Sequence, residues 1–260
     1  MLTLYHGLAS TCSKKVRMCL KEKGLAYESR LVNLQRYEQH DPEYLKLNPK
    51  GVVPTLVHDG KPITESTLII EYLDEAFPAP PLHPAGAYGR HKMRLWTKWS
   101  DDVGYNAVYV PTWEKLSRPG ASRMDDAALA KMLERVPTAE RRKRWAQTAR
   151  TGFSAEEFAA AYENMRSTFA AMETSLADSP WLAGEMFTLA DIAIAPFVER
   201  IIDLRPETLD EVGGAPRLRG WLTRMQARPS WQEAFFFQGM DASTGAVRAK
   251  IAEALGEAAA

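Results

Sequence analysis

Cysteine, excess charge and long apolar runs are all scarce in this chain, and each absence excludes a class of protein. Cys12 and Cys19 are its only cysteines, which excludes a disulfide framework and favours a reducing cytoplasm. Its 33 basic and 33 acidic side chains balance, so we expect no nucleic-acid partner. No window approaches the roughly 18 apolar residues of a membrane span, and no signal-peptide pattern is present. We therefore expect a cytoplasmic protein without a membrane partner.

The composition that remains is typical of a globular protein. Hydrophobic residues make up 45% of the chain and charged residues 25%, values that exclude disorder and collagen-like structure. Stacked prolines within 77–81, followed by Pro84, cannot continue a helix. We therefore predict one domain over 1–80 and a second over 88–260.

The first domain alternates short strands and helices. Strands over 2–5 and 27–32 flank a helix over 13–23. The dipeptide Asp59-Gly60 lies between two further strand-like runs and favours the tight turn of a hairpin. A helix over 66–76 follows, which gives the order βαβ and then ββα.

The second domain is predicted to be entirely helical. One long pattern covers 88–110 and should end or kink at Pro111, because proline lacks the N–H that a helix needs. The stretch 114–152 is polar and rich in charge. Further helices are expected over 154–177, 188–202, 215–227 and 247–259.

Hydroxyl and thiol groups gather between the first strand and the first helix. Ser10, Thr11, Cys12 and Ser13 follow one another there. A hydroxyl that donates a hydrogen bond to a bound thiol favours the thiolate. Cys12 is a candidate nucleophile, but dithiol redox chemistry is disfavoured because no Cys-x-x-Cys motif is present. Ordinary capping of the helix is the alternative explanation.

Two further positions suit the binding of a peptide-like ligand. Proline at 54 can adopt the cis form and expose the backbone of Val53 to a ligand that lies alongside like an extra strand. Glu65 and Ser66 open a helix, where N–H groups and the helix dipole attract an anion. A trans turn proline and a plain helix cap are the simpler explanations, and His40 fits a solvated loop.

The order of these features resembles the thioredoxin-like domain of the glutathione transferase superfamily. In the second domain, Phe187 to Ile192 resembles the family's capping box and hydrophobic staple, in which Thr188 caps and Asp191 reaches back. The resemblance implies an α/β thioredoxin-like N-terminal domain and an all-α C-terminal domain. The motifs that carry it in the first domain are Ser10-Thr11-Cys12-Ser13, Val16-Arg17, Gln39-His40, Leu47-Asn48-Pro49, Val53-Pro54-Thr55-Leu56 and Glu65-Ser66.

This resemblance implies that glutathione is the co-substrate and that no metal is required. Val53 would pair with the cysteinyl backbone of glutathione. Glu65 and Ser66 would hold the γ-glutamyl end, while His40 and Gln39 would lie near the glycyl carboxylate.

Three residues compete for the role of thiol activator. Ser10 matches the serine of theta- and zeta-like enzymes, and Ser13 matches the serine of one bacterial β-etherase group. Cys12 would suggest an omega-like thiol enzyme, but the omega cysteine matches position 10. We rank Ser10 slightly above Ser13 and keep both.

The second domain is longer than is usual in this superfamily, and the excess falls mainly over 114–152. Val136-Pro137, Trp145 and Gly152-Phe153, together with 93–99 upstream, are similar to the glutathione-dependent β-etherases of bacterial lignin-dimer breakdown. This similarity implies a hydrophobic aromatic ketone as substrate, and the superfamily implies a homodimer. The serine loop is more zeta-like.

Aromatic and basic side chains of the second domain offer further candidates. Tyr105, Tyr109 and Trp113 are spaced i, i+4, i+8 and would form a stripe on one helix that stacks an aryl substrate. Packing in the core or against a second subunit is the alternative. The basic run 141–144 is typical of a solvated helix face, and contact with an acidic ligand is its functional alternative.

Three hypotheses follow from the sequence. The leading one is a β-etherase in which a glutathione thiolate displaces an aryloxy group beside a ketone. The second is a zeta-like glutathione-dependent cis-trans isomerase or a general detoxifying transferase. The third is a non-catalytic binding protein built on the same fold.

Overall fold

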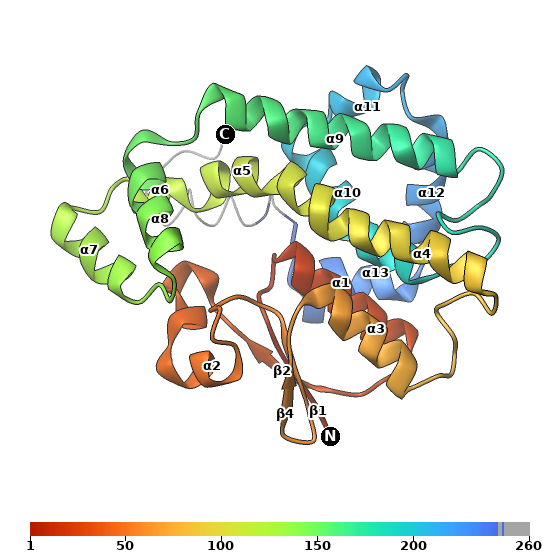
Figure 1. Ribbon diagram of the computed structural model, residues 1–260, viewed down its shortest axis with the longest axis horizontal. Coiled ribbons are helices and arrows are strands. Elements are labelled where there is room, and N and C mark those ends of the chain that lie inside the picture. Colours follow the sequence, from red (N-terminus) through yellow and green to blue (C-terminus); the bar gives the residue numbers. More distant parts are fainter. Residues whose placement is uncertain (244–245, 247–260) are drawn as a thin grey trace.

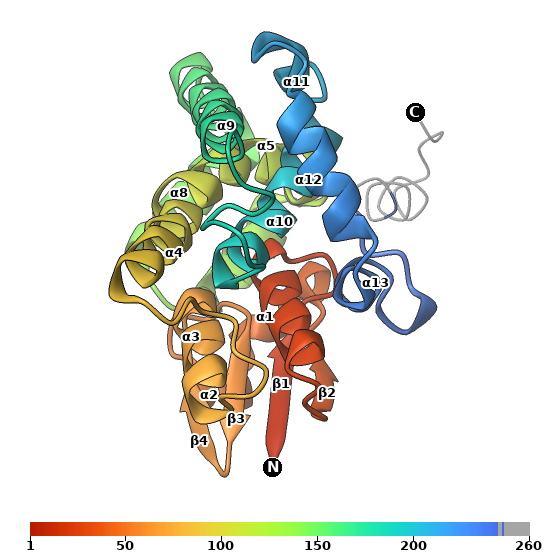
Figure 2. The same cartoon turned by 90° about the vertical axis from the view of Figure 1, so that its right-hand side faces the viewer.

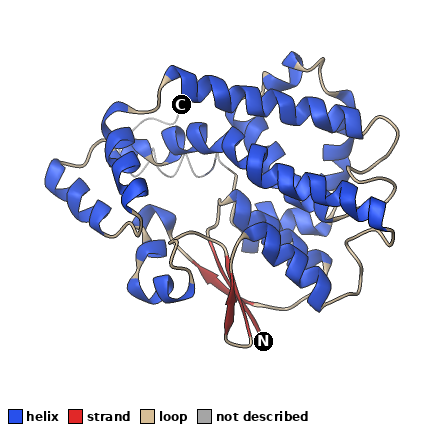
Figure 3. Cartoon of the chain, viewed as in Figure 1, coloured by secondary structure: helices blue, strands red, loops and turns tan. Residues whose placement is uncertain are grey.

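A small sheet and a large helical bundle make up the protein (Figures 1 and 3). The computed structural model describes residues 1–243 and 246, so the tail helix expected over 247–259 lies outside the described residues. Figure 2 shows the sheet at one end of the molecule, α1 and α3 next to it, and the remaining long helices beyond them. This is the expected fold of a sheet-containing part followed by a helical part.

The sheet has four strands in the order β2-β1-β3-β4. Strand β1 is parallel to β2 and antiparallel to β3, and β3 is antiparallel to β4. Asp59 and Gly60 both have positive φ, 48° and 77°, which confirms the tight hairpin turn. The strands are β1 (Leu2–His6), β2 (Glu28–Leu31), β3 (Thr55–His58) and β4 (Lys61–Ile63).

One hydrophobic core joins the sheet to the helices. Leu4 and Leu56 of the sheet, Val16 of α1 and Phe197 of α10 are all fully buried in the same cluster. The helices of the first part are α1 (Thr11–Glu22), α2 (Pro42–Leu47) and α3 (Ser66–Ala76), and short 3₁₀ turns occupy Leu34–Arg36 and Glu38–His40.

The long pattern over 88–110 divides differently from our expectation. Helix α4 passes through a π-helical segment into α5, which continues beyond Pro111. Burial of Val108, Val110 and Trp113 offsets the roughly 3 kcal/mol that an internal proline costs. The helices here are α4 (Ala87–Trp99), the π-helical segment (Ser100–Gly104) and α5 (Tyr105–Leu116).

The polar stretch 114–152 folds into three helices with a small core of their own. Trp113, Leu129, Met132 and Val136 are buried together there. Helices α7 and α8 extend toward the α2 region of the first part (Figure 1). The three helices are α6 (Arg118–Ala121), α7 (Asp126–Glu134) and α8 (Ala139–Thr151).

The remaining helices follow the sequence pattern closely. They are α9 (Ala155–Ser175), α10 (Leu189–Leu204), α11 (Thr208–Glu211), α12 (Pro216–Gln226) and α13 (Pro229–Phe235), and a 3₁₀ turn occupies Phe237–Gly239.

The expected capping box of α10 is present and fully buried. The carboxylate of Asp191 accepts hydrogen bonds from the backbone N–H groups of Thr188 and Leu182 and from the indole of Trp221, at 2.8 to 3.1 Å. Burial raises the pKa of Asp191 to about 6, against the opposing effect of these donors. The side chain therefore links the start of α10 to α12.

We predict that Asp191→Ala destabilises the protein by at least about 3 kcal/mol, because several buried donors lose their acceptor. Asp125→Ala is the matched control, since Asp125 caps α7 on the exposed surface and should cost about 1 kcal/mol. Urea unfolding followed by circular dichroism measures both. Equal losses in the two variants would contradict the prediction.

Candidate functional site

The two candidate serines at the start of α1 lie in different environments. Ser10 is partly exposed and caps α1, because its Oγ accepts a hydrogen bond from the N–H of Ser13 at 3.2 Å. Ser13 is fully buried, and its own Oγ accepts from the N–H of Gly7 at 3.1 Å. Of the two serines, only Ser10 is exposed to solvent in part. Cys12 is also partly exposed.

Two buried guanidinium groups hold this loop in place. Arg17 donates to the carbonyls of Gly7 and Leu8 at 3.2 and 2.7 Å. Arg200, on α10, donates to the carbonyl of Ala9 at 2.6 Å. Three successive carbonyls before Ser10 are therefore fixed by the two arginines.

Lys14 and Lys15 of α1 are buried and do not contribute exposed charge to the loop. Lys14 Nζ lies 3.1 Å from Glu199 of α10, and Lys15 Nζ lies 3.3 Å from Asp101. Burial lowers the pKa of Lys14 to about 8, while Glu199 opposes that change. These cations join α1 to the helical part.

The Val53-Pro54 peptide bond is cis, one of the two forms that the sequence allowed. Tyr44 and Asn48 hold the preceding carbonyl of Val52 at 2.6 and 2.9 Å. Within the described part of the chain, neither the N–H nor the C=O of Val53 has a hydrogen-bond partner. Val53 therefore offers one backbone donor and one acceptor to a strand-like ligand.

Glu65 and Ser66 stand at the start of α3. Glu65 has φ of 65° and ψ of 109°, a conformation that costs a non-glycine residue about 1–3 kcal/mol and is concentrated at ligand sites. Neither side chain caps the helix, so the plain helix-cap explanation is wrong. The Glu65 carboxylate instead lies 2.8 Å from Lys50 Nζ, and Ser66 is buried.

Gln39 and His40 are buried, so the solvated-loop explanation for His40 is also wrong. Their exposed fractions are 6% and 2%. In the described structure, Gln39 Oε1 has no hydrogen-bond partner, and the His40 ring has only a weak backbone contact, with Gly51. Burial, with the positive charges of Arg141 and Arg135, lowers the pKa of His40 to about 4.

The aromatic stripe on α5 is present along the helix. Tyr105 and Tyr109 stack with ring centroids 5.6 Å apart, and Tyr105 is 44% exposed. Trp113 is buried and meets Phe153 edge to face at 5.5 Å. The two tyrosines therefore form a stacked, partly exposed aromatic pair, whereas Trp113 packs in the core of the α6–α8 region.

Comparison with known proteins accounts for this arrangement. Residues 4–81 match the family description "Glutathione S-transferase, N-terminal domain", and residues 155–224 match "Glutathione S-transferase, C-terminal domain". Protein LigF of Sphingobium sp. is 35% identical over 240 residues, which cover 90% of this chain and 93% of LigF.

The chain belongs to the glutathione S-transferase family. It is an enzyme, and glutathione is its co-substrate. The crystal structure of beta-etherase LigF superimposes with a TM-score of 0.80 at 33% identity, over 90% of this chain and 98% of LigF. A theta class transferase from Xanthomonas axonopodis with glutathione bound gives a TM-score of 0.66 at 26% identity, over 90% and 96% of the two chains.

A zeta-named plant enzyme is similar over a shorter length. Glutathione S-transferase Z2 of Arabidopsis thaliana is 36% identical over 157 residues, which are 60% of this transferase and 63% of the plant protein.

The basic run of α8 makes tertiary contacts that sequence reasoning did not predict. Arg141 donates to the carbonyl of Lys50 at 2.7 Å. Arg144 pairs with Glu157 and lies over the Phe153 ring, 5.1 Å from its centroid. Lys143 and Arg144 are exposed, as expected for a solvated helix face, whereas Arg141 is half-buried. Lack of apolar periodicity hid these contacts, and the similarity of 114–152 to β-etherases was the only available signal.

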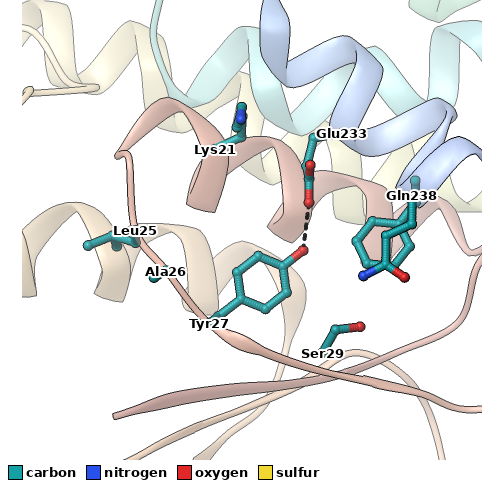
Figure 4. Close-up of a pocket in the computed structure, with 8 residues that line it drawn as sticks. Lys21, Leu25, Ala26, Tyr27, Ser29, Glu233 and Gln238 are labelled. Carbon is teal, nitrogen blue, oxygen red and sulfur yellow. Dashed lines mark hydrogen bonds between the residues drawn. The ribbon is translucent and has the colours of Figure 1, made fainter.

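The transferase also has a cavity of about 270 Å³ that is separate from this site. Lys21, Tyr27 and Glu233 line it, and the Tyr27 hydroxyl donates to Glu233 at 2.9 Å (Figure 4). Lys21 is in the last turn of α1, about 15 Å along the helix from Ser10. Across the residues described, no group of three potential metal ligands occurs and no helix is long and apolar enough to cross a membrane.

The low pKa of His40 predicts a loss of stability in acid. Neutral His40 is favoured in the folded state, so the unfolded chain takes up a proton first as pH falls from about 6.5 toward 4. Over this window the free energy of unfolding should fall less steeply in His40→Gln, by up to about 1.4 kcal/mol per pH unit.

Urea unfolding at a series of pH values measures this slope. The control is His91→Gln, because His91 is exposed on α4 and should leave the slope unchanged. Parallel pH profiles for wild type and His40→Gln would show that His40 does not contribute.

Proposed function

We propose that this glutathione transferase cleaves β-aryl ether bonds of lignin-derived aromatic ketones. The observation that carries the proposal is the likeness to LigF, a beta-etherase, at 35% identity over 90% of the chain. The zeta-named relative matches only 60% of the chain. Shared features outside the common family regions support a shared type of substrate.

Glutathione would lie along the exposed edge of the cis-proline turn. Val53 would exchange two backbone hydrogen bonds with the cysteinyl residue of glutathione. Glu65 and Ser66 would hold the γ-glutamyl group at the start of α3, where N–H groups favour a carboxylate. Gln39 and His40 would lie at the glycyl end.

The thiol would then lie by the loop that opens α1. Ser10 would donate its hydroxyl proton to the sulfur and stabilise the thiolate, since it is the serine with a partly exposed side chain. Ser13 has a structural partner in Gly7. Cys12 would line the site.

The reaction is a substitution at the carbon that bears the aryloxy group. The thiolate sulfur forms a bond to this carbon while the carbon–oxygen bond breaks and its electron pair leaves with the aryloxide. The aryloxide takes up the proton that glutathione released, so the products are a phenol and a glutathione thioether. Tyr105 and Tyr109 would stack the aryl ring and hold the two reactants together.

An isomerase is the second candidate, favoured by the zeta-named relative and the Ser10-Thr11-Cys12-Ser13 loop. There the thiolate would add reversibly to a conjugated double bond.

A cytoplasmic location and a homodimer are also part of this proposal. The two free cysteines are in keeping with a reducing cytoplasm.

Product analysis distinguishes these activities. Purified enzyme and glutathione are incubated separately with each enantiomer of an aryl-ether ketone, with an aryl halide and with a cis-enone diacid. We expect the enzyme to cleave one of the two aryl-ether enantiomers. Phenol and glutathione thioether should then be formed in equal amounts. Conjugation of the halide without any ether cleavage would contradict the β-etherase, and turnover of the diacid without glutathione consumption would favour the isomerase.

Substitution at the loop tests the thiol activator. Ser10→Ala should raise the pKa of the bound glutathione thiol and lower kcat/KM at neutral pH about 10- to 100-fold, because a hydrogen bond to a charged group is lost. Cys12→Ala should retain turnover. Ultraviolet absorbance of the thiolate, recorded against pH with glutathione bound, measures the pKa directly.

Ser13→Ala is the informative comparison for this prediction. Its buried partner Gly7 N–H would lose an acceptor, so stability should fall by about 1–3 kcal/mol while the pKa of the bound thiol stays unchanged. A raised thiol pKa in Ser13→Ala, together with a normal pKa in Ser10→Ala, would reverse the assignment.

A further inference from the structure

Helices α7 and α8 form a cover over the loop that carries Gln39 and His40. Arg135 donates to the carbonyl of Tyr37 and pairs with Asp41. Arg141 donates to the carbonyl of Lys50 at 2.7 Å. These contacts join residues more than 90 positions apart, so the cover is a tertiary feature that the extra length of the helical part creates.

The cover packs so closely on the loop beneath it that only glycine fits at position 51. A Cβ on Gly51 would lie 2.8 Å from His40 Cδ2 and 2.9 Å from Pro137 Cγ. Gly51 also has φ of 60°, which favours glycine. The ring of Trp145, from α8, lies 5.6 Å from the ring of His40. His40 is thus enclosed by both parts of the molecule.

Polar atoms beneath the cover are not fully paired. In the described structure Gln39 Oε1 has no hydrogen-bond partner, and the buried His40 ring has only a weak backbone contact, with Gly51. A buried polar atom left unpaired costs about 1–3 kcal/mol, and native proteins tolerate it where a ligand supplies the missing partner. Both side chains therefore have hydrogen-bonding capacity left for a ligand.

The unused charge at this place belongs to Arg141. One terminal nitrogen binds the Lys50 carbonyl, and among residues 1–243 and 246 no carboxylate pairs with this guanidinium. Arg141 therefore lies beside Lys50, the residue before Gly51, which packs against His40.

We propose that Arg141 binds the glycyl carboxylate of glutathione, so that α8 of the helical part is a wall of the glutathione site. The proposal rests on the glutathione pose given under Proposed function. The remaining N–H groups of Arg141 form a fork that suits a carboxylate. Neutral His40 donates a second hydrogen bond from one ring nitrogen, and Gln39 Oε1 accepts from the glycyl N–H.

A comparison of two ligands, one with and one without the glycyl charge, tests the contact between Arg141 and the glycyl carboxylate. Calorimetry compares glutathione with its glycyl ethyl ester, which keeps every other group but has no glycyl charge. Arg141→Gln should weaken binding of glutathione about 10- to 100-fold, yet leave binding of the ester unchanged. Arg141→Lys should restore part of the loss, because the charge remains and the fork does not.

Lys143→Gln is the matched control. It removes one positive charge from the same helix at an exposed position, so a general effect of charge would appear in it equally. We expect glutathione binding of Lys143→Gln to equal that of wild type.

Three results would overturn the proposal: equal loss for glutathione and ester in Arg141→Gln, no loss for either, or the same loss in Lys143→Gln. Equal loss for the two ligands would mean that Arg141 only shapes the loop. In each of these cases wild-type binding of glutathione still supports the pose on which the proposal rests. If wild-type enzyme binds neither ligand, the glutathione pose itself fails.

Discussion

Burial of α1 between the sheet and the helical part dictates how the site is held. A helix covered on all sides must find partners for its polar side chains, and α1 carries Lys14, Lys15 and Arg17 in its buried stretch. Lys14 and Lys15 meet carboxylates of the helical part, while Arg17 holds the carbonyls that precede Ser10. The same burial that stabilises the core therefore sets the position of the loop that carries Ser10.

Sequence reasoning predicted the features whose physics is local. The Asp59-Gly60 hairpin follows from the backbone conformations of two residues, and the capping box of α10 follows from groups three positions apart. The strand and helix order of the first part was predictable for the same reason. The candidate residues around Val53 and Glu65 needed the family resemblance, because each alone also fits an ordinary turn or cap.

Long-range contacts explain what sequence reasoning missed. Burial of His40 depends on α8, about a hundred residues further along the chain, and no local pattern encodes that contact. Pro111 stays inside α5 because the packing of its neighbours outweighs the low helix propensity of proline. The basic run of α8 is partly solvated, as expected, but its contacts with backbone carbonyls and with Glu157 could not be predicted from a local pattern.

The proposed site is unequal at its two ends, and this inequality would suit a two-substrate reaction. At one end His40 and Gln39 are enclosed under α7 and α8. At the other end Tyr105 remains 44% exposed beside its stacked partner Tyr109. A co-substrate that is common to every turnover gains from an enclosed, charge-complementary end, because low solvent exposure strengthens each polar contact. A variable aromatic electrophile needs the open, apolar end, where shape and stacking decide which compound fits. Under the proposed function, the added length of the helical part would act on both substrates, since Arg141 of α8 lies at the enclosed end and Arg144 lies beside Tyr109 and Phe153.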